Sequence, residues 1–180
     1  MLDSDLNSLQ IVHLMFYLYL TYCRGPSPPA VRPTDVRGHY CSSSPSRTTG
    51  IRVGKPFSGL QFFTRSLPCF TELHTLFYRE GVKIIPDNLY ELLTPVALAH
   101  LIMGDATAKS HGLILCTDSY SIEDIVRLIN VLIIKFRLDC TIRVERKNQY
   151  RIYIRERSMN LIRQIVKPHM CSSMLYKIKL

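Results

Sequence analysis

The spacing of hydrophobic and polar positions changes along the chain and divides it into three regions. Residues 9–22 form an apolar run that is shorter than the roughly 20 residues a membrane-spanning helix needs. Residues 24–50 are rich in Pro, Ser, Arg and Gly and show no sustained period, which is typical of a disordered linker. Regular patterning begins only at about residue 52. We therefore expect residues 1–51 to be a disordered extension, with no membrane span.

From residue 52 onward, periods typical of strands and of amphipathic helices follow one another. The predicted elements are a strand at 59–63, a helix at 68–82, a helix that begins at Pro95, a strand at 112–119, a long helix at 121–138, strands at 140–146 and 149–157, and a helix at 158–167 that Pro168 ends. Helices and antiparallel strands in this succession predict an α+β fold.

Two of these helices begin with capping signals. Thr94 precedes Pro95 at a first helical position, and Ser121 precedes Asp124 by three residues, as in a capping box. On the long helix we expect one apolar face in the core and three cations in solvent. The apolar face comprises Ile122, Ile125, Val126, Ile129, Leu132, Ile133 and Phe136, and the cations are Arg127, Lys135 and Arg137.

Two segments share a design at an offset of 92 residues. Residues 59–76 and residues 151–168 each read as an alternating strand, then Arg-Ser-Leu or Arg-Ser-Met, then an amphipathic helix. A repeat of this kind indicates two copies of one unit, the first lacking its beginning. It predicts a molecule with a pseudo-twofold axis.

The positive charge of the chain is concentrated in its second half. The formal net charge is +9, and residues 94–180 contain 14 Lys or Arg against 7 Asp or Glu. An anionic partner is therefore expected for this half, and both nucleic acid and an anionic membrane surface meet that description.

The six cysteines and six histidines show no metal-binding spacing. No CxxC, HExxH or HxH pattern occurs, and Cys116 and Cys140 lie inside apolar runs. We expect these thiols to be reduced core residues, no zinc site, and a reducing compartment inside the cell.

Alternation in the last two predicted strands separates an apolar face from a basic one. In 149–157, Ile152 and Ile154 point one way, and in 140–146, Ile142 and Val144 do so. The opposite face carries Thr141, Arg143, Glu145, Arg151, Tyr153, Arg155 and Arg157, with Arg146, Lys147 and Asn148 in the turn. A two-stranded ribbon fits the major groove, where arginine binds guanine edges and phosphates. The alternative is a solvated sheet face without a partner.

Residues 98–106, LAHLIMGDA, form an apolar stretch that ends with a single carboxylate, Asp105. This acid is either a polar residue where a buried helix surfaces, or a group that the helix carries to a site. The stretch resembles the LAGLIDADG motif of homing endonucleases, with outright matches at Leu98, Ala99, Leu101, Ile102 and Asp105. Other parts, including GLILCTDSYS, YRIYIR and SMLYKI, are similar to two-motif LAGLIDADG proteins encoded in organellar introns. The resemblance covers about residues 52–180.

The resemblance implies the LAGLIDADG homing endonuclease fold, with a motif helix, a saddle-shaped antiparallel sheet and flanking helices. Two motif helices pack along a twofold axis in this family, and the small residues Ala97, Ala99 and Gly104 would allow the close approach. Each helix delivers one acid, and the pair binds divalent metal between the scissile phosphates. The implied activity is Mg²⁺-dependent hydrolysis of both strands of a long double-stranded DNA target, and the implied location is the mitochondrion.

The resemblance also implies roles for individual residues. They are catalysis for Asp105, Asp118 and Arg157; metal binding at Asp105 and Ala106; and DNA binding by Lys109, Thr141, Arg143, Arg146, Lys147, Arg151, Tyr153 and Arg155. Structural alternatives exist for two positions, since Asp118 could satisfy the turn before Ser121, and Ser158, next to Arg157, could cap a helix.

The chain departs from the family pattern in two ways. Ala106 replaces the glycine that ends the motif, which would cost roughly 1 kcal/mol or more if a positive φ were required there. Only one motif is present where this subfamily has two, so we expect a truncated chain. In this interpretation residues 52–93 are the tail of a first repeat with a linker, and residues 94–180 are a complete repeat.

A homodimer, or a separate first-repeat half, would then have to complete the active site. The competing hypotheses are an intron maturase that binds RNA through the same basic surface, and a remnant without catalysis.

Overall fold

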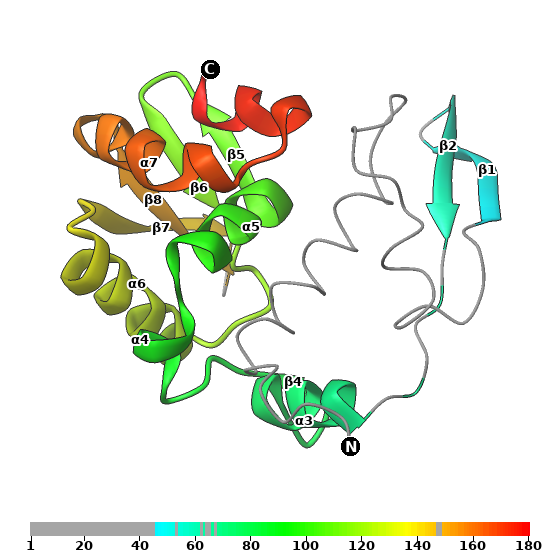
Figure 1. Ribbon diagram of the computed structural model, residues 1–180, viewed down its shortest axis with the longest axis horizontal. Helices are drawn as coiled ribbons and strands as arrows, with labels where there is room; N and C mark the ends of the chain where they lie inside the picture. The colour runs from blue at the N-terminus through cyan, green and yellow to red at the C-terminus, as the bar shows by residue number, and fades with distance from the viewer. Residues whose placement is uncertain (1–45, 53, 62, 64–65, 67, 147–148) are drawn as a thin grey trace.

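A computed structural model describes residues 46–180, apart from residues 53, 62, 64, 65, 67, 147 and 148 (Figure 1). Of the extension expected at residues 1–51, only residues 46–51 are described, and they form part of a strand. Lys147 and Asn148 lie outside the described residues. In the part of the chain that the structure describes, no helix has the length and apolar character needed to span a membrane.

A four-stranded antiparallel sheet in the order β5-β6-β8-β7 organises the second half of the chain. Its strands are β5 (Ala106–Lys109), β6 (Gly112–Leu115), β7 (Cys140–Arg146) and β8 (Gln149–Arg155). The helices are α5 (Pro95–Asp105), α6 (Ile122–Phe136) and α7 (Met159–Val166), with 3-10 helices η1 (Glu156–Ser158), η2 (Lys167–His169) and η3 (Ser172–Ile178) (Figure 1). The predicted α+β fold is confirmed.

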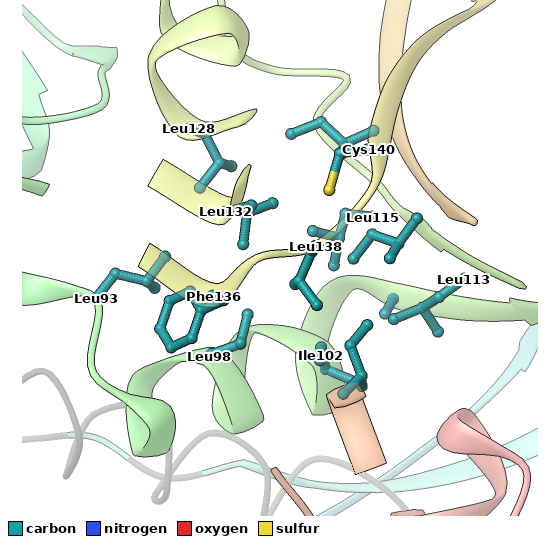
Figure 2. Packing of buried hydrophobic residues seen from close by; sticks show 14 of the residues in the cluster. Leu93, Leu98, Ile102, Leu113, Leu115, Leu128, Leu132, Phe136, Leu138 and Cys140 are labelled. Carbon is teal, nitrogen blue, oxygen red and sulfur yellow. The ribbon is translucent and has the colours of Figure 1, made fainter. Parts of the chain in front are cut away.

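The hydrophobic core lies between one face of this sheet and the three α-helices (Figure 2). The sheet contributes Leu113, Leu115, Ile152 and Ile154; α5 contributes Leu98 and Ile102; α6 contributes Leu128, Leu132 and Phe136; and α7 contributes Ile162 and Val166. Ile152 and Ile154 are fully buried, as the alternation of the last strand predicted. Burial of each such side chain is worth about 1.5–3 kcal/mol relative to exposure.

Helix α6 buries four of the seven apolar positions predicted for its core face, which are Ile125, Ile129, Leu132 and Phe136. Ile125, Leu128 and Leu132 are buried, but Ile122, Val126 and Ile133 are 37%, 42% and 42% exposed. The prediction was wrong for the latter three because this helix has more apolar positions than the sheet and α5 can cover. Val131, which the prediction omitted, lies on the buried side instead.

Two cations of α6 are tied to the segment before α5, contrary to the expectation that they are solvated. Arg127 Nη1 donates to the carbonyl of Ile85 at 2.8 Å and to Asp124 Oδ1 at 3.0 Å. Lys135 Nζ donates to the carbonyl of Tyr90 and lies over its ring, 4.9 Å from the centroid. Both side chains therefore fix the segment that leads into α5. Arg137 is exposed, as expected.

Both predicted helix caps are present. Thr94 Oγ1 accepts a hydrogen bond from the amide of Ala97 at 3.2 Å, with Pro95 at the first helical position. Ser121 Oγ accepts from the amide of Asp124 at 3.1 Å. Each hydroxyl satisfies one of the amides that a helix start leaves without an intrahelical partner.

The described residues before α5 form two hairpins and two helices. They are β1 (Ser46–Arg52), β2 (Lys55–Gln61), α3 (Pro68–Phe77), β3 (Tyr78–Arg79), β4 (Val82–Lys83) and α4 (Leu89–Leu92), with β1 paired to β2 and β3 to β4. The predicted helix at 68–82 ends at Phe77 instead. Glu80 and Gly81 have φ of 52° and 76°, and two left-handed residues make a tight hairpin turn rather than a helix.

The segment after β8 also differs from its prediction. The strand expected to reach residue 157 ends at Arg155, and the next three residues form η1 before α7 begins. The order of strand then helix recurs in β2 and α3, as the repeat predicted. The pairing differs, since β2 belongs to a two-stranded sheet and β8 is a central strand.

Candidate functional site

Asp105 is the last residue of α5 and is exposed to solvent. The chain passes from it directly into β5, and its carbonyl accepts a hydrogen bond from the amide of Cys116, just after β6, at 2.9 Å. The amide of Ala106 donates to the carbonyl of Ile102, which closes the last turn. The carboxylate is thus carried by a buried helix and fixed at the sheet edge by backbone hydrogen bonds.

Ala106 carries no strain in place of a glycine. Its φ is −92°, in the extended region, and its side chain is 3% exposed. The positive φ that would have penalised alanine is not adopted here. Since its methyl group faces the core, Ala106 could reach a metal only through its carbonyl oxygen, and its metal-binding role stays a prediction.

A cavity of about 70 Å³ lies beside Asp105. Most of its lining is apolar, and the polar side chains at its wall are those of Asp105, Thr117 and Tyr120 together with the thiol of Cys116. Lys83, from β4, places its ammonium 4.7 Å from the centroid of the Tyr120 ring. A cation and a phenol therefore stand next to the candidate metal-binding acid.

Electrostatics keep this cation charged. Burial lowers the pKa of Lys83, but the polar contact with Tyr120 and the negative charge of Asp105 outweigh it, so the pKa ends above its ordinary value. Burial raises the pKa of Tyr120, which stays a neutral phenol at physiological pH. Sequence reasoning missed both residues. The turn residues Glu80 and Gly81 were the available sequence signal for Lys83. They form the hairpin that turns β4, and Lys83 with it, towards Asp105.

The carboxylate of Asp105 is suited to be one ligand of a magnesium ion. Mg²⁺ commonly takes one or two carboxylates and completes its shell with water and phosphate oxygens. Among the described residues, no three His, Cys, Asp or Glu side chains gather at one point. Asp105, exposed at the end of α5, can thus supply one carboxylate of such a site.

Asp118 is engaged by an arginine of the sheet. Arg151 Nε donates to Asp118 Oδ1 at 2.9 Å and Arg151 Nη2 to Asp118 Oδ2 at 2.8 Å. The hydrogen bonds from Arg151 lower the pKa of Asp118 below its usual value, and in return raise the pKa of Arg151. Asp118 is not among the residues that line the cavity beside Asp105. Its catalytic role stays a prediction.

Arg157 lies outside the strand that was predicted to hold it, and its catalytic role stays a prediction. It belongs to η1 rather than to β8, and its guanidinium contacts Asp139 Oδ2. With Arg137 and Leu138 it lines a hollow between the end of α6 and the start of α7 that shares no lining residue with the cavity beside Asp105. Its neighbour Ser158 accepts a hydrogen bond from the amide of Asp139 at 2.7 Å and does not cap α7 with its side chain.

The face of the sheet opposite the helices carries the predicted basic side chains. Strand register sets them in rows: Lys109, Gly112 and Arg155; Thr107, Ile114, Tyr153 and Thr141; and Arg151 with Arg143. Arg143 stacks on Tyr153, with the guanidinium carbon 3.5 Å from the ring centroid. Arg146 is exposed beyond them, and Lys147 is outside the described residues. Val144, expected in the core, is 70% exposed because β7 is an edge strand whose end extends past the helices.

Gly112, the first residue of β6, shapes the end of this face beside the β5–β6 turn. Its φ is 152°, and a Cβ there would collide with the carbonyl oxygen of Ile154 and approach the Tyr153 ring to 3.1 Å. Tyr153 uses the space to donate its hydroxyl to the carbonyl of His111 at 2.6 Å. Only glycine at position 112 leaves room for the Tyr153 ring and the carbonyl of Ile154.

The arrangement defines a class of protein with a basic sheet face and an acid at the end of a buried helix. The sequence profile described as the LAGLIDADG DNA endonuclease family matches residues 35–162, so the chain belongs to that family. We had expected the resemblance to start at about residue 52, but the match begins earlier, at residue 35. The boundaries expected at 51/52 and 93/94 stay predictions.

Relatives and a solved structure agree with the family. The chain is 30% identical over 146 residues to the intron-encoded endonuclease ai4 of Dictyostelium discoideum, covering 77% of this chain and 92% of that protein. It is 30% identical over 142 residues to the cytochrome b mRNA maturase bI2 of Debaryomyces hansenii, covering 77% of this chain and about half of that protein, 54%.

The homing endonuclease I-WcaI, solved bound to its DNA recognition sequence, has the same fold. Its TM-score to this chain is 0.77 at 23% identity, covering 97% of this chain and 88% of that one. The LAGLIDADG homing endonuclease fold expected from the motif is confirmed.

Proposed function

We propose that this chain acts in a site-specific, Mg²⁺-dependent endonuclease that hydrolyses both strands of a long double-stranded DNA target. One observation carries the proposal: an exposed carboxylate, Asp105, ends a buried helix at the edge of a sheet whose open face carries Arg143, Arg151 and Arg155. The chain belongs to a family of DNA endonucleases, and DNA hydrolysis suits an acid that lies beside a basic binding face.

Binding is assigned to the open sheet face. Arg143 and Arg155 are exposed there and can contact phosphates or guanine edges, while Tyr153 holds Arg143 by stacking. Lys109, Thr141, Arg146, Lys147 and Arg151 complete the proposed DNA-binding set.

Asp105 would hold the metal, which when bound supplies a Lewis acid and activates water. Lys83 remains protonated beside it and can neutralise a phosphate. Asp118 and Arg157 act in this proposal only if DNA displaces Arg151 and Asp139 from them.

The second acid of the site is assigned to a second copy of the chain or to a separate first-repeat half. Ala97 and Ala99 belong to the buried hydrophobic cluster of this structure. Gly104 differs, since a Cβ there would meet nothing within 4 Å. The open side of α5 near Gly104 is therefore the proposed approach for the partner helix.

Cleavage by a reconstituted complex tests the proposal. The chain, alone and mixed with a protein that supplies the other motif helix, would be offered a library of linear DNA duplexes in Mg²⁺ or in excess chelator. Cutting is expected only in Mg²⁺, and Asp105→Asn should abolish it while folding and DNA binding persist. Asp87→Asn, which removes another exposed acid, is the matched control and should cut normally. Cutting by Asp105→Asn at the native rate would refute the assignment.

An intron maturase is the second candidate function, and the names of two relatives favour it. The Debaryomyces hansenii protein and a 32% identical protein of Saccharomyces cerevisiae are both cytochrome b mRNA maturases. In this interpretation the ligand is intron RNA, and the mitochondrion is the proposed location for either function. An RNA that competes with DNA for the chain, together with splicing support that survives Asp105→Asn, would favour the maturase. Binding of neither nucleic acid would indicate a remnant.

A further inference from the structure

A buried lysine lies beneath the end of the motif helix. Lys177, in η3, is 4% exposed. Its Nζ donates to the carbonyl of Met103 at 2.6 Å and to the carbonyl of Gly104 at 3.3 Å. These two residues immediately precede Asp105. Nothing in the proposed DNA-binding face or metal site uses this ammonium, although burying a charge is costly unless it is well paired.

Lys177 completes the hydrogen bonding of this helix end. A helix leaves its last carbonyls without intrahelical amide donors. Here the Ala106 amide closes the last regular turn on the carbonyl of Ile102, and the Cys116 amide donates to that of Asp105. The carbonyls of Met103 and Gly104, between them, accept from Lys177. An ammonium has three donors, and its charge is favoured at the negative end of the helix dipole.

The C-terminal segment holds the lysine in place from several sides. Ile178, next to Lys177, is fully buried, and its carbonyl accepts from Arg163 Nε at 2.9 Å. The amide of Cys171 lies 3.4 Å from Met103 Sδ. The segment is therefore attached to α7 and to α5 itself.

We infer that Lys177 is a positioning residue: it fixes the last turn of α5 so that Asp105 is held at the angle the metal site requires. The inference rests on the proposed function, in which Asp105 binds the metal. Lys177 does not touch substrate in this account. It acts through two backbone carbonyls. The exposed neighbour Lys179 donates to the carbonyl of Ser110, outside α5, and we expect it to have no such effect.

Two readouts test this role, one of them independent of cleavage. Lys177→Met keeps the length of the side chain and removes the donors, and Lys179→Met is the matched control. Hydrogen exchange of the amides of residues 104–107 should become about tenfold faster or more in Lys177→Met, while core amides of α6 and β8 exchange as before. In the reconstituted complex, turnover should fall roughly 10- to 100-fold with DNA affinity unchanged. Lys177→Arg should restore most of both.

The outcomes distinguish a positioning role of Lys177 from a general stabilising role. The inference would be overturned if exchange accelerated equally in all core amides. It would also be overturned if a Lys177→Met chain with a loosened α5 end had normal turnover. If Lys177→Met does not fold, Lys177→Gln is measured instead; it is shorter and loses the charge but keeps an amide donor, so the amides of residues 104–107 should again exchange faster than in the native chain, by a smaller factor. If the native complex never cuts DNA, the proposed function fails, and local loosening at residues 104–107 still decides whether Lys177 holds the helix end.

Discussion

On one face of β8, Ile152 and Ile154 are fully buried beneath the helices, whereas on the other face Arg151 and Tyr153 stay partly exposed. The buried face is held by packing that is insensitive to salt and pH. The open face is held by ion pairs, by a stacked arginine and by a tyrosine that needs Gly112 beneath it. Residues of one strand therefore divide into those that maintain the fold and those that can exchange their partners for an anionic ligand.

The open face is less free than an arginine count suggests. Arg151 contacts both Asp118 and Glu145, and Arg155 Nε lies 3.5 Å from Asp139 Oδ2. These acids orient the guanidinium groups, and DNA phosphates must compete with them. Exposed pairs of this kind are worth little in stability, about 0–1 kcal/mol, so a polyanion can displace them at low cost.

The largest expected effect is on the buried face. Ile154→Ala removes a fully buried side chain from the centre of the sheet and should lower the free energy of unfolding by about 2–5 kcal/mol. Chemical denaturation followed by circular dichroism would measure it. DNA affinity of the fraction that remains folded should be unchanged. A loss below about 0.5 kcal/mol, typical of a surface substitution, would contradict this packing.

The next effect belongs to the open face and should appear only in binding. Replacing Arg143 and Arg155 by alanine should weaken DNA binding by about 1–3 kcal/mol for each arginine that contacts a base. It should also lower the salt dependence of binding by roughly one counterion for each phosphate that the variant no longer neutralises. Titrations by fluorescence anisotropy at several salt concentrations give both quantities. Lys167→Ala, an exposed cation in η2 after α7, is the control and should leave the salt slope intact. An unchanged slope in the double variant would place the binding face elsewhere.

This division between faces could be predicted from sequence only in part. Strict alternation located Ile152, Ile154 and the arginines, because a central strand under helices buries every second residue. The same reasoning failed at Val144, since alternation does not reveal where an edge strand leaves the core. It failed for Arg157 because the backbone turns into η1 two residues earlier than the apolar pattern suggests.

Long-range contacts at the candidate site were beyond the sequence pattern. The motif located Asp105, but Lys83 and Lys177 reach it or its helix from 22 residues before and 72 residues after it in the chain. Neither lysine stands out in its own segment. The hairpin turn at Glu80-Gly81 brings Lys83 to Asp105, and the packing of η3 brings Lys177 to the end of α5. Such long-range contacts leave no periodic pattern in the sequence.

A smaller effect is expected from the pair that joins Asp118 to Arg151. Because the hydrogen bonds of Arg151 lower the pKa of Asp118 below its usual value of 3.8, the pair stabilises the fold above that pH. The contribution is lost as the pH falls through the lowered, folded-state value. Asp118→Asn should therefore cost no more than about 1 kcal/mol at neutral pH, given the exposure of the pair, and the cost should shrink as the pH is lowered from neutral into the range below 3.8. Urea unfolding of both chains across this range measures the difference, and a gap that widens in acid would contradict the pairing.

The smallest expected effect comes from Glu145, the acid on the basic face. Its Oε1 lies 3.2 Å from Arg151 Nη1, and its side chain is 44% exposed. Glu145→Gln keeps the shape, removes a charge that repels DNA phosphates and releases one side of Arg151. The unfolding free energy should change by less than about 1 kcal/mol, while DNA affinity should rise a few-fold at low salt and converge with that of the native chain as salt screens the charge. Glu123→Gln, at the exposed start of α6, removes the same charge away from this face and should not alter binding. Weaker binding by Glu145→Gln would mean that Glu145 holds Arg151 in its DNA-binding orientation, and that the ion pairs of the open face assist recognition rather than compete with it.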